Sequence, residues 1–279
     1  MLRRIIASIV LPLFLLSACV EKPDPVVPDD PIEEPEQPEK PEQPEQPEEP
    51  KDKDVTLMSA FSEEFSALES EYFDFGYRQS GDDFRFYSGF PSLSESGNTI
   101  LMLRLDPADE AGKGAVLTSK DYTYYGSYSV RLRIPDVLAV QSKLGACVQF
   151  ALYDEDEVFG TDEVSLSIDL IDRTVIRTFL SRTEPGGSPV TVDETIAPEL
   201  SGFDASSKYY VYGFDWSEGK IVWWFKTKPS GDMTVLKEIS ENVPSQPLRL
   251  QLRYHHTAQA PNYPYELETD WIKYTPSQQ

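Results

Sequence analysis

Residues 209–226 read YYVYGFDWSEGKIVWWFK. Aromatic and β-branched side chains dominate two runs, 209–216 and 220–226, and such residues fit the pleated surface of a β-sheet. The polar segment Ser217-Glu218-Gly219 separates the two runs, and a connection of this length that contains glycine is typical of a β-hairpin. This stretch therefore predicts two adjacent antiparallel strands.

The strand signal extends outward from this hairpin. Residues 127–134, 163–170 and 248–255 alternate polar and apolar side chains with a period of two, which predicts strands with one buried and one solvated face. Only Ser62–Tyr72 has a pattern that suits a short helix. Many closely spaced strands between residues 55 and 279 predict an all-β, two-sheet sandwich of the jelly-roll type.

Composition excludes several classes of function. The 279 residues carry 48 acidic and 25 basic side chains, a net charge of −23, so no basic stripe is available for nucleic acid or an anionic membrane surface. The chain has only two cysteines, Cys19 and Cys147, and two histidines, which argues against a disulfide scaffold and against Cys/His zinc sites. Cys147 lies in an apolar run, and we interpret it as a small core residue.

The N-terminal residues form a predicted leader and linker. Arg3 and Arg4 precede a short apolar run that ends in Leu16-Ser17-Ala18-Cys19, a pattern that resembles the lipobox of bacterial lipoproteins; an ordinary signal peptide is the alternative. Residues 20–50 contain ten prolines and twelve Asp or Glu, so we expect an extended linker over 19–54 after a signal peptide over 1–18. Cys19 would then carry lipid and hold the chain on the outer membrane, facing the cell exterior or the periplasm.

The predicted domain, residues 55–279, resembles glycoside hydrolase family 16, the family of lichenases and laminarinases. The resemblance implies a concanavalin-like β-jelly roll with a sugar-binding cleft across one sheet. It rests on nine segments that occur in the family's order along the chain: 61–65, 117–120, 125–131, 203–206, 212–216, 220–224, 243–248, 253–254 and 268–274.

The catalytic strand of that family has the pattern Glu-x-Asp-x-Glu, in which the first Glu is the nucleophile and the last is the acid/base. Here Glu163 matches the nucleophile, whereas Ser165 replaces the Asp and Ser167 replaces the acid/base. A serine cannot protonate a glycosidic oxygen at neutral pH, and loss of a general acid typically lowers a rate by about 10²–10⁴-fold. The sequence therefore predicts a degenerate catalytic site.

Three side chains are candidates for sugar contact. Tyr254 matches a family position that is usually a cleft tryptophan, and we leave open whether its ring binds sugar or packs in the core. His255 follows it as a hydrogen-bonding neighbour. Trp224 is a second candidate platform, because it lies on the opposite strand face from Trp223.

The remaining aromatic and acidic candidates have structural roles. We place Trp216, Trp223 and Trp271 in the core. Asp270 matches an Asp that supplies one ligand to a structural calcium ion in several relatives, and its alternative is a surface acid at a strand end. No cofactor is required by the motif; calcium would be structural.

Three functional hypotheses follow. The first is a surface carbohydrate-binding lipoprotein without catalytic activity, which captures a neutral β-glycan for an importer and partner hydrolases. The second is a working endo-β-glycanase of the β-1,3/1,4-glucanase type. The third is a structural or adhesive surface protein. The net charge of −15 on residues 55–279 favours a neutral glycan over an acidic one.

Overall fold

A computed structural model describes residues 53–67, 69–77, 84–87, 99–105, 107, 114–137, 145–156, 160–184, 189–257 and 262–278. The predicted signal peptide, Cys19 and most of the linker lie outside these residues. Residues 50–279 form one compact unit. In the described part of this unit no helix is long and apolar enough to cross a bilayer.

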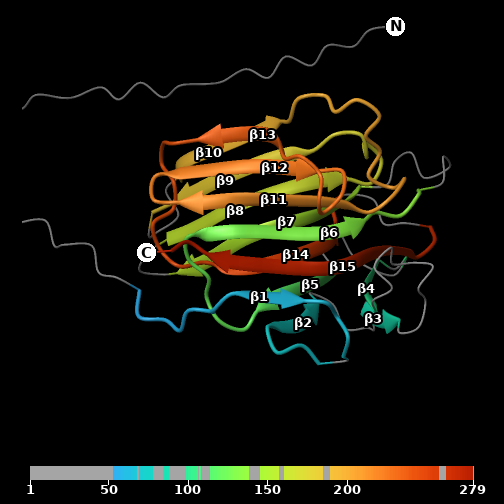
Figure 1. Ribbon diagram of the computed structural model, residues 1–279, viewed down its shortest axis with the longest axis horizontal. Coiled ribbons are helices and arrows are strands. Elements are labelled where there is room, and N and C mark those ends of the chain that lie inside the picture. The colour runs from blue at the N-terminus through green and yellow to red at the C-terminus, as the bar shows by residue number, and fades with distance from the viewer. Residues whose placement is uncertain are drawn as a thin grey trace, which may run out of the picture. The chain divides into compact units, whose positions relative to one another are not determined.

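The described chain consists of strands that pair antiparallel in two layers, which confirms the predicted all-β sandwich (Figure 1). The strands are β1 (Phe61–Glu63), β2 (Phe73–Tyr77), β3 (Phe84–Tyr87), β4 (Ile100–Leu105), β5 (Gly114–Ser119), β6 (Gly126–Arg133), β7 (Ala146–Asp156), β8 (Gly160–Asp169), β9 (Arg177–Thr183), β10 (Pro189–Ile196), β11 (Tyr210–Ser217), β12 (Lys220–Lys226), β13 (Thr234–Ile239), β14 (Arg249–His256) and β15 (Tyr265–Pro276).

The two sheets have different strand orders. One is β13-β12-β11-β6-β15-β4-β3, with β1 added beside β15, and the other is β10-β9-β8-β7-β14-β5-β2. In Figure 1 the first sheet lies in front of the second. Because strand side chains alternate between faces, one apolar side of each sheet faces the other sheet and together they form the core.

The predicted hairpin is present. β11 pairs with β12 from Val211↔Lys226 to Ser217↔Lys220. Gly219, at the turn, has a φ of +66°, a conformation that glycine adopts without steric cost.

The predicted helix over Ser62–Tyr72 is wrong. Glu63 ends β1, and its carboxylate accepts hydrogen bonds from the Phe65 amide (2.8 Å) and from the Ser70 hydroxyl. Phe65 has a φ of +50°, which is incompatible with a right-handed helix. The buried Glu63 side chain therefore organises a loop that places Phe65 in the core.

Candidate functional site

β8 positions the three motif residues on one face. Val164, Leu166 and Ile168 point into the core, so the intervening Glu163, Ser165 and Ser167 lie on the outer face of the sheet. This confirms the predicted alternation of this strand. The Trp223 indole N–H, from the opposite sheet, donates a hydrogen bond to the Ser165 carbonyl (2.9 Å) and so holds β8 from its core side.

Glu163 is the centre of a hydrogen-bond network on this face. Its Oε1 accepts from Gln149 Nε2 (2.6 Å) and from the Ser165 hydroxyl (3.1 Å). Its Oε2 pairs with Arg253 Nη1 at 3.2 Å, and both side chains are largely buried. Both carboxylate oxygens of Glu163 are therefore already acceptors within the protein.

Arg253 comes from β14 and is held by several partners besides Glu163. Its Nε donates to Gln251 Oε1 (2.6 Å) and its Nη1 to Gln149 Oε1 (3.1 Å), while its guanidinium carbon lies 4.5 Å from the centre of the Tyr153 ring. β14 and β8 are separated by β7, where Gln149 pairs with Arg253 on one side and with Ser167 on the other. Arg253 thus reaches the motif across one intervening strand.

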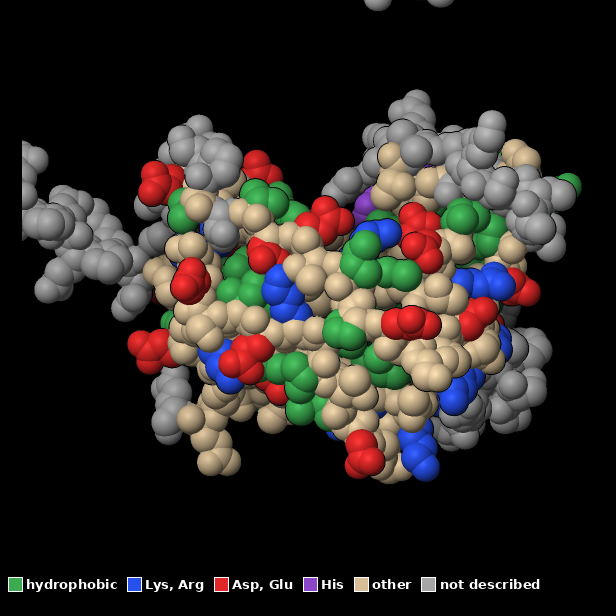
Figure 2. All heavy atoms as spheres, turned by 90° about the horizontal axis from the view of Figure 1, so that it is seen from above, with side chains coloured by type: hydrophobic (Ala, Val, Ile, Leu, Met, Phe, Trp, Pro, Cys, Tyr) green, Lys and Arg blue, Asp and Glu red, His purple; other side chains and the backbone are tan. Residues whose placement is uncertain are grey.

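The network borders a shallow open depression of about 310 Å³. In Figure 2 the outer face of this sheet lies along the top of the view, where the outline is hollowed and acidic, basic and hydrophobic side chains lie close together. The depression is lined by seven residues from β7, β8, β9, β10 and β14: Gln149, Glu163, Ser167, Arg177, Phe179, Glu194 and Arg253.

Two rings are presented on the cleft face, and neither was predicted from the sequence. Phe179 of β9 pairs with Ser165, and Tyr153 of β7 pairs with Glu163, so the two rings flank the motif on opposite sides. Both are half-buried. The Tyr153 hydroxyl donates to Glu155 (3.0 Å), and burial together with this bond raises the Tyr153 pKa.

The structure corrects the predicted aromatic platforms. Tyr254 is fully buried among core residues, on the inner face of β14 beside Leu250 and Leu252, so its ring cannot stack on a sugar. Trp224 lies on the other sheet, where it packs with Val211 and Trp271 in a small cluster that is largely closed to solvent.

Close packing around Trp224 explains the glycine beside it. A Cβ atom added to Gly213 would lie 2.4 Å from the Trp224 ring and 2.4 Å from the Tyr128 carbonyl oxygen. Trp216 and Trp223 are in the main core as predicted, whereas Trp271 is buried in the Trp224 cluster instead.

His255 lies on the cleft sheet next to Cys147. Its Nε2 is 3.6 Å from the Cys147 sulfur, and the two residues are a cross-strand pair of β14 and β7. Cys147 is therefore on the outer face and not in the core, which corrects its predicted position. Burial raises the pKa of its thiol to about 12, so the thiol stays protonated at neutral pH.

Asp270 is completely buried and forms an ion pair with Arg131, which is also buried. It is not a surface acid. A guanidinium next to the carboxylate repels a second cation, and the described residues contain no group of three or more Asp, Glu, His or Cys side chains placed to hold a metal ion. These surroundings of Asp270 do not fit the predicted calcium ion, and we assign no chemical step to calcium.

Among the described residues, the lining of the depression carries two carboxylates, those of Glu163 and Glu194. A retaining glycosidase needs two carboxyl groups about 5–5.5 Å apart. The second carboxylate on the lining, Glu194, is on β10, two strand spacings or about 9.5 Å across the sheet from β8. Ser167, which lines the depression, supplies a hydroxyl in place of the acid.

The two antiparallel sheets define a β-sandwich protein of the jelly-roll type. The family model "Glycosyl hydrolases family 16" matches residues 81–273, and the chain belongs to this family.

Curated relatives are β-glucanases. The chain is 23% identical to a β-glucanase of Brevibacillus brevis over 175 residues, which are 60% of this chain and 61% of that relative. It is 29% identical to a β-glucanase of Paenibacillus polymyxa over 82 residues, 26% of this chain and 32% of the relative. The matches thus span less than two thirds of the relatives' length.

Solved structures share the fold. A lichenase from a mouse hindgut metagenome superimposes with a TM-score of 0.60 at 19% identity, covering 79% of this chain and all of that one. A family 16 endo-glucanase of Bacteroides ovatus gives a TM-score of 0.56 at 10% identity, covering 77% and 99%. At these identities the likeness shows the fold alone.

Proposed function

We propose that this chain is a carbohydrate-binding member of family 16, anchored to the cell surface by lipid, that captures a neutral β-linked glycan without hydrolysing it. The observation that carries the proposal is the network around Glu163. The carboxylate is held by Arg253, Gln149 and Ser165, and hydroxyls occupy the two following motif positions. The hydroxyls of Ser165 and Ser167 can bind and position a sugar, but they cannot donate a proton to the leaving group as the family's acid does.

Two half-buried rings on this face supply the means of recognition. Aromatic side chains contribute large apolar contact area with little loss of side-chain entropy, and Tyr153 and Phe179 lie on either side of β8. Hydroxyl and amide groups around them, such as those of Ser167 and Gln149, provide hydrogen bonds to sugar hydroxyls.

The charges on the lining favour a neutral ligand. The lining includes Arg177, Arg253, Glu163 and Glu194, so the depression has as many cations as anions. The acidic surplus elsewhere in the domain weakens the attraction of acidic polysaccharides. A neutral β-glucan is therefore our first choice of ligand, and an importer and partner hydrolases would receive it from this protein.

An active endo-β-glucanase is the second candidate. The names of the relatives favour it, and so does Glu163, which stands on the cleft face where a nucleophile belongs. The third candidate, a structural or adhesive protein, predicts no glycan binding at all. Binding and hydrolysis assays on one preparation therefore separate the three hypotheses.

The full chain carrying Cys19→Ala, which lacks the acylated thiol, should bind mixed-linkage β-glucan or laminarin and release no reducing ends. Phe179→Ala should weaken binding by about 1 kcal/mol, roughly five-fold, because one stacked ring is lost. Affinity electrophoresis and calorimetry measure the binding, and a reducing-sugar assay measures hydrolysis. Val235→Ala, an exposed apolar side chain on the other sheet, serves as the matched control and should change nothing.

Hydrolysis that disappears in Glu163→Gln would establish the enzyme and overturn the proposal. Absence of binding to every neutral β-glycan tested would leave the structural hypothesis. Binding that survives both Phe179→Ala and Tyr153→Ala would move the glycan away from this face.

Lipid attachment at Cys19 is the second part of the proposal, and the sequence pattern of residues 16–19 supports it. Cys19→Ala should abolish acylation and shift the protein from the membrane fraction to the soluble fraction of lysed cells. Metabolic labelling with a fatty-acid analogue and fractionation measure the two effects. Cys147→Ala is the control, because this thiol lies on the sheet face beside His255 and should not affect anchoring.

A further inference from the structure

A second depression, of about 270 Å³, lies where the loop of residues 200–208 passes the ends of β11, β12 and β13. None of its lining residues lines the depression over β8. We call it the aromatic cup. Pockets that bind drug-sized ligands typically measure about 300–1,000 Å³, and the cup is slightly smaller. A cup of this size suits a single small ring better than a chain of sugars.

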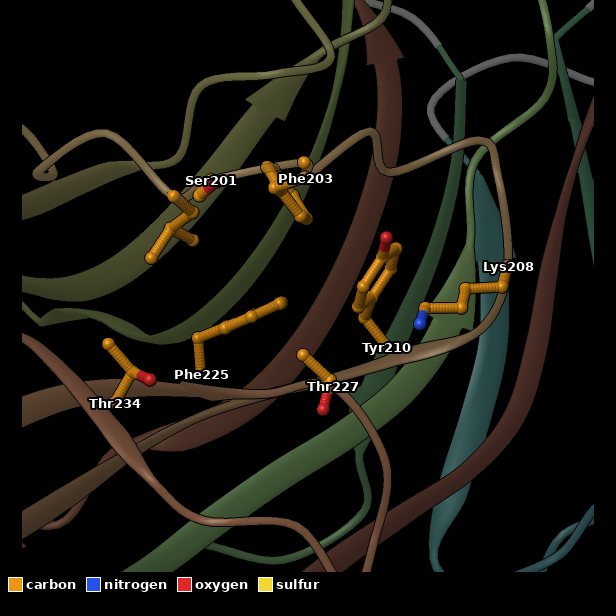
Figure 3. Close-up of a pocket in the computed structure, with 9 residues that line it drawn as sticks. Ser201, Phe203, Lys208, Tyr210, Phe225, Thr227 and Thr234 are labelled. Atoms are coloured by element: carbon orange, nitrogen blue, oxygen red, sulfur yellow. The ribbon is translucent and has the colours of Figure 1, made fainter.

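Three rings form the base of the cup. Phe203 from the loop meets Tyr210 edge-on at 5.1 Å between ring centres and meets Phe225 edge-on at 5.2 Å. Tyr210 and Phe225 are 5.3 Å apart. Figure 3 shows these side chains arriving from the loop and from two strands around one common space. The three rings belong to the main core and expose little of their surface, so they form a fixed floor under the cup.

The rim of the cup is polar. Ser201, Thr227 and Thr234 are exposed residues whose hydroxyls can donate and accept hydrogen bonds. Lys208 reaches toward the cup, and its Nζ lies 5.2 Å from the centre of the Tyr210 ring (Figure 3). In the part of the chain that the structure describes, no carboxylate lies within 4.0 Å of this ammonium group and no anionic side chain lines the cup.

The Lys208 side chain is exposed, and its ammonium stands beside the hydroxyls of the rim. This arrangement suits a small ligand with several hydroxyls and one negative charge. We propose that the aromatic cup binds a single acidic sugar unit, whose anionic group pairs with Lys208 and whose hydroxyls bond the polar rim. A carboxylate or a sulfate ester meets this requirement equally well.

This site is independent of the neutral glycan proposed for the β8 face. Binding there depends on Phe179 and Tyr153, whereas binding in the cup depends on Lys208. Each proposal can therefore fail without the other. Glycans that combine neutral backbones with acidic side units would engage both sites.

The test uses the full chain carrying Cys19→Ala and three probes: methyl β-D-glucuronide, galactose 6-sulfate and the uncharged methyl β-D-glucoside. NMR titration or calorimetry should show binding of at least one acidic probe. The glucoside should bind at least about ten-fold more weakly, because it lacks the charge-assisted hydrogen bond to Lys208. The two acidic probes separate a carboxylate ligand from a sulfated one.

Variants locate the site. Lys208→Met removes the ammonium and keeps most of the unbranched side chain, so it should weaken acidic-probe binding by about ten-fold or more, while Lys208→Arg should retain it. Lys228→Met, an exposed lysine outside the cup, is the matched control, and Phe179→Ala should leave this binding unchanged. Equal affinity for the glucoside, no loss in Lys208→Met, or no binding of either acidic probe would each overturn the proposal.

Discussion

Tyr254→Ala is expected to lower the free energy of unfolding by about 3–5 kcal/mol, the range found when a large buried aromatic side chain is removed. The ring is fully buried between the sheets, on a strand that pairs with β5 on one side and β7 on the other. Neighbouring strands hold the backbone in place, so the surroundings cannot collapse into the space left behind. Chemical denaturation followed by tryptophan fluorescence measures the change.

Tyr254→Phe is the matched control for this prediction. The Tyr254 hydroxyl is buried and has no hydrogen-bond partner among the described residues, and burial raises its pKa well above the ordinary value. An unpaired buried hydroxyl costs about 1–3 kcal/mol, so its removal should leave stability unchanged or raise it. Glycan binding by the folded fraction should persist in both variants. A stable Tyr254→Ala protein that no longer binds glycan would contradict the core assignment and would indicate that the Tyr254 ring contacts the glycan.

Arg131→Met is expected to cost about 3–5 kcal/mol of stability, because it removes one partner of a buried ion pair. The Asp270 side chain is fully buried and that of Arg131 is 3% exposed, so water cannot replace the lost guanidinium. The same side chain also lies 4.9 Å from the ring of Tyr209, a contact that methionine would keep only in part. Thermal and denaturant unfolding give the difference.

The neighbouring pair provides the comparison. Arg133 bonds Glu268 through two nitrogens, at 2.9 and 2.7 Å, but its side chain is 33% exposed. Arg133→Met should therefore cost clearly less than Arg131→Met, since solvent screens the pair. Arg131→Met with Asp270→Leu should recover part of the loss, because no charge then stays buried. Equal effects of the two single variants would show that burial does not control these pairs.

Local patterns in the sequence predicted the strands and their faces well. The 209–226 hairpin and the outward face of β8 follow from residue type and period-two alternation, which depend only on near neighbours along the chain. The helix over 62–72 failed because a buried carboxylate, Glu63, binds the loop, and this contact depends on the folded sheet.

The role of Tyr254 stayed open in the sequence because two signals disagree. The alternation of residues 248–255 places Tyr254 on the apolar face with Leu250 and Leu252, whereas the family resemblance matches it to a cleft position, and its burial decides for the core. The same alternation predicted that Arg253 lies on the polar, outward face of its strand. Its contact with Glu163 could not be foreseen, because it requires that β14, β7 and β8 be neighbours, and strand order is not encoded in any local pattern.

The pairing of Glu163 with Arg253 bears on how a hydrolase of this fold could be rebuilt. Under the proposed function, an Asp introduced at position 165 and a Glu introduced at position 167 would restore the Glu-x-Asp-x-Glu pattern of the family in the sequence. The guanidinium would nevertheless still bind the nucleophile's carboxylate, and Gln149 would keep its second oxygen occupied. The path back to catalysis therefore requires changes on three strands at once. Each single substitution would restore little activity on which natural selection could act. An engineered reversal would therefore begin with the replacement of Arg253.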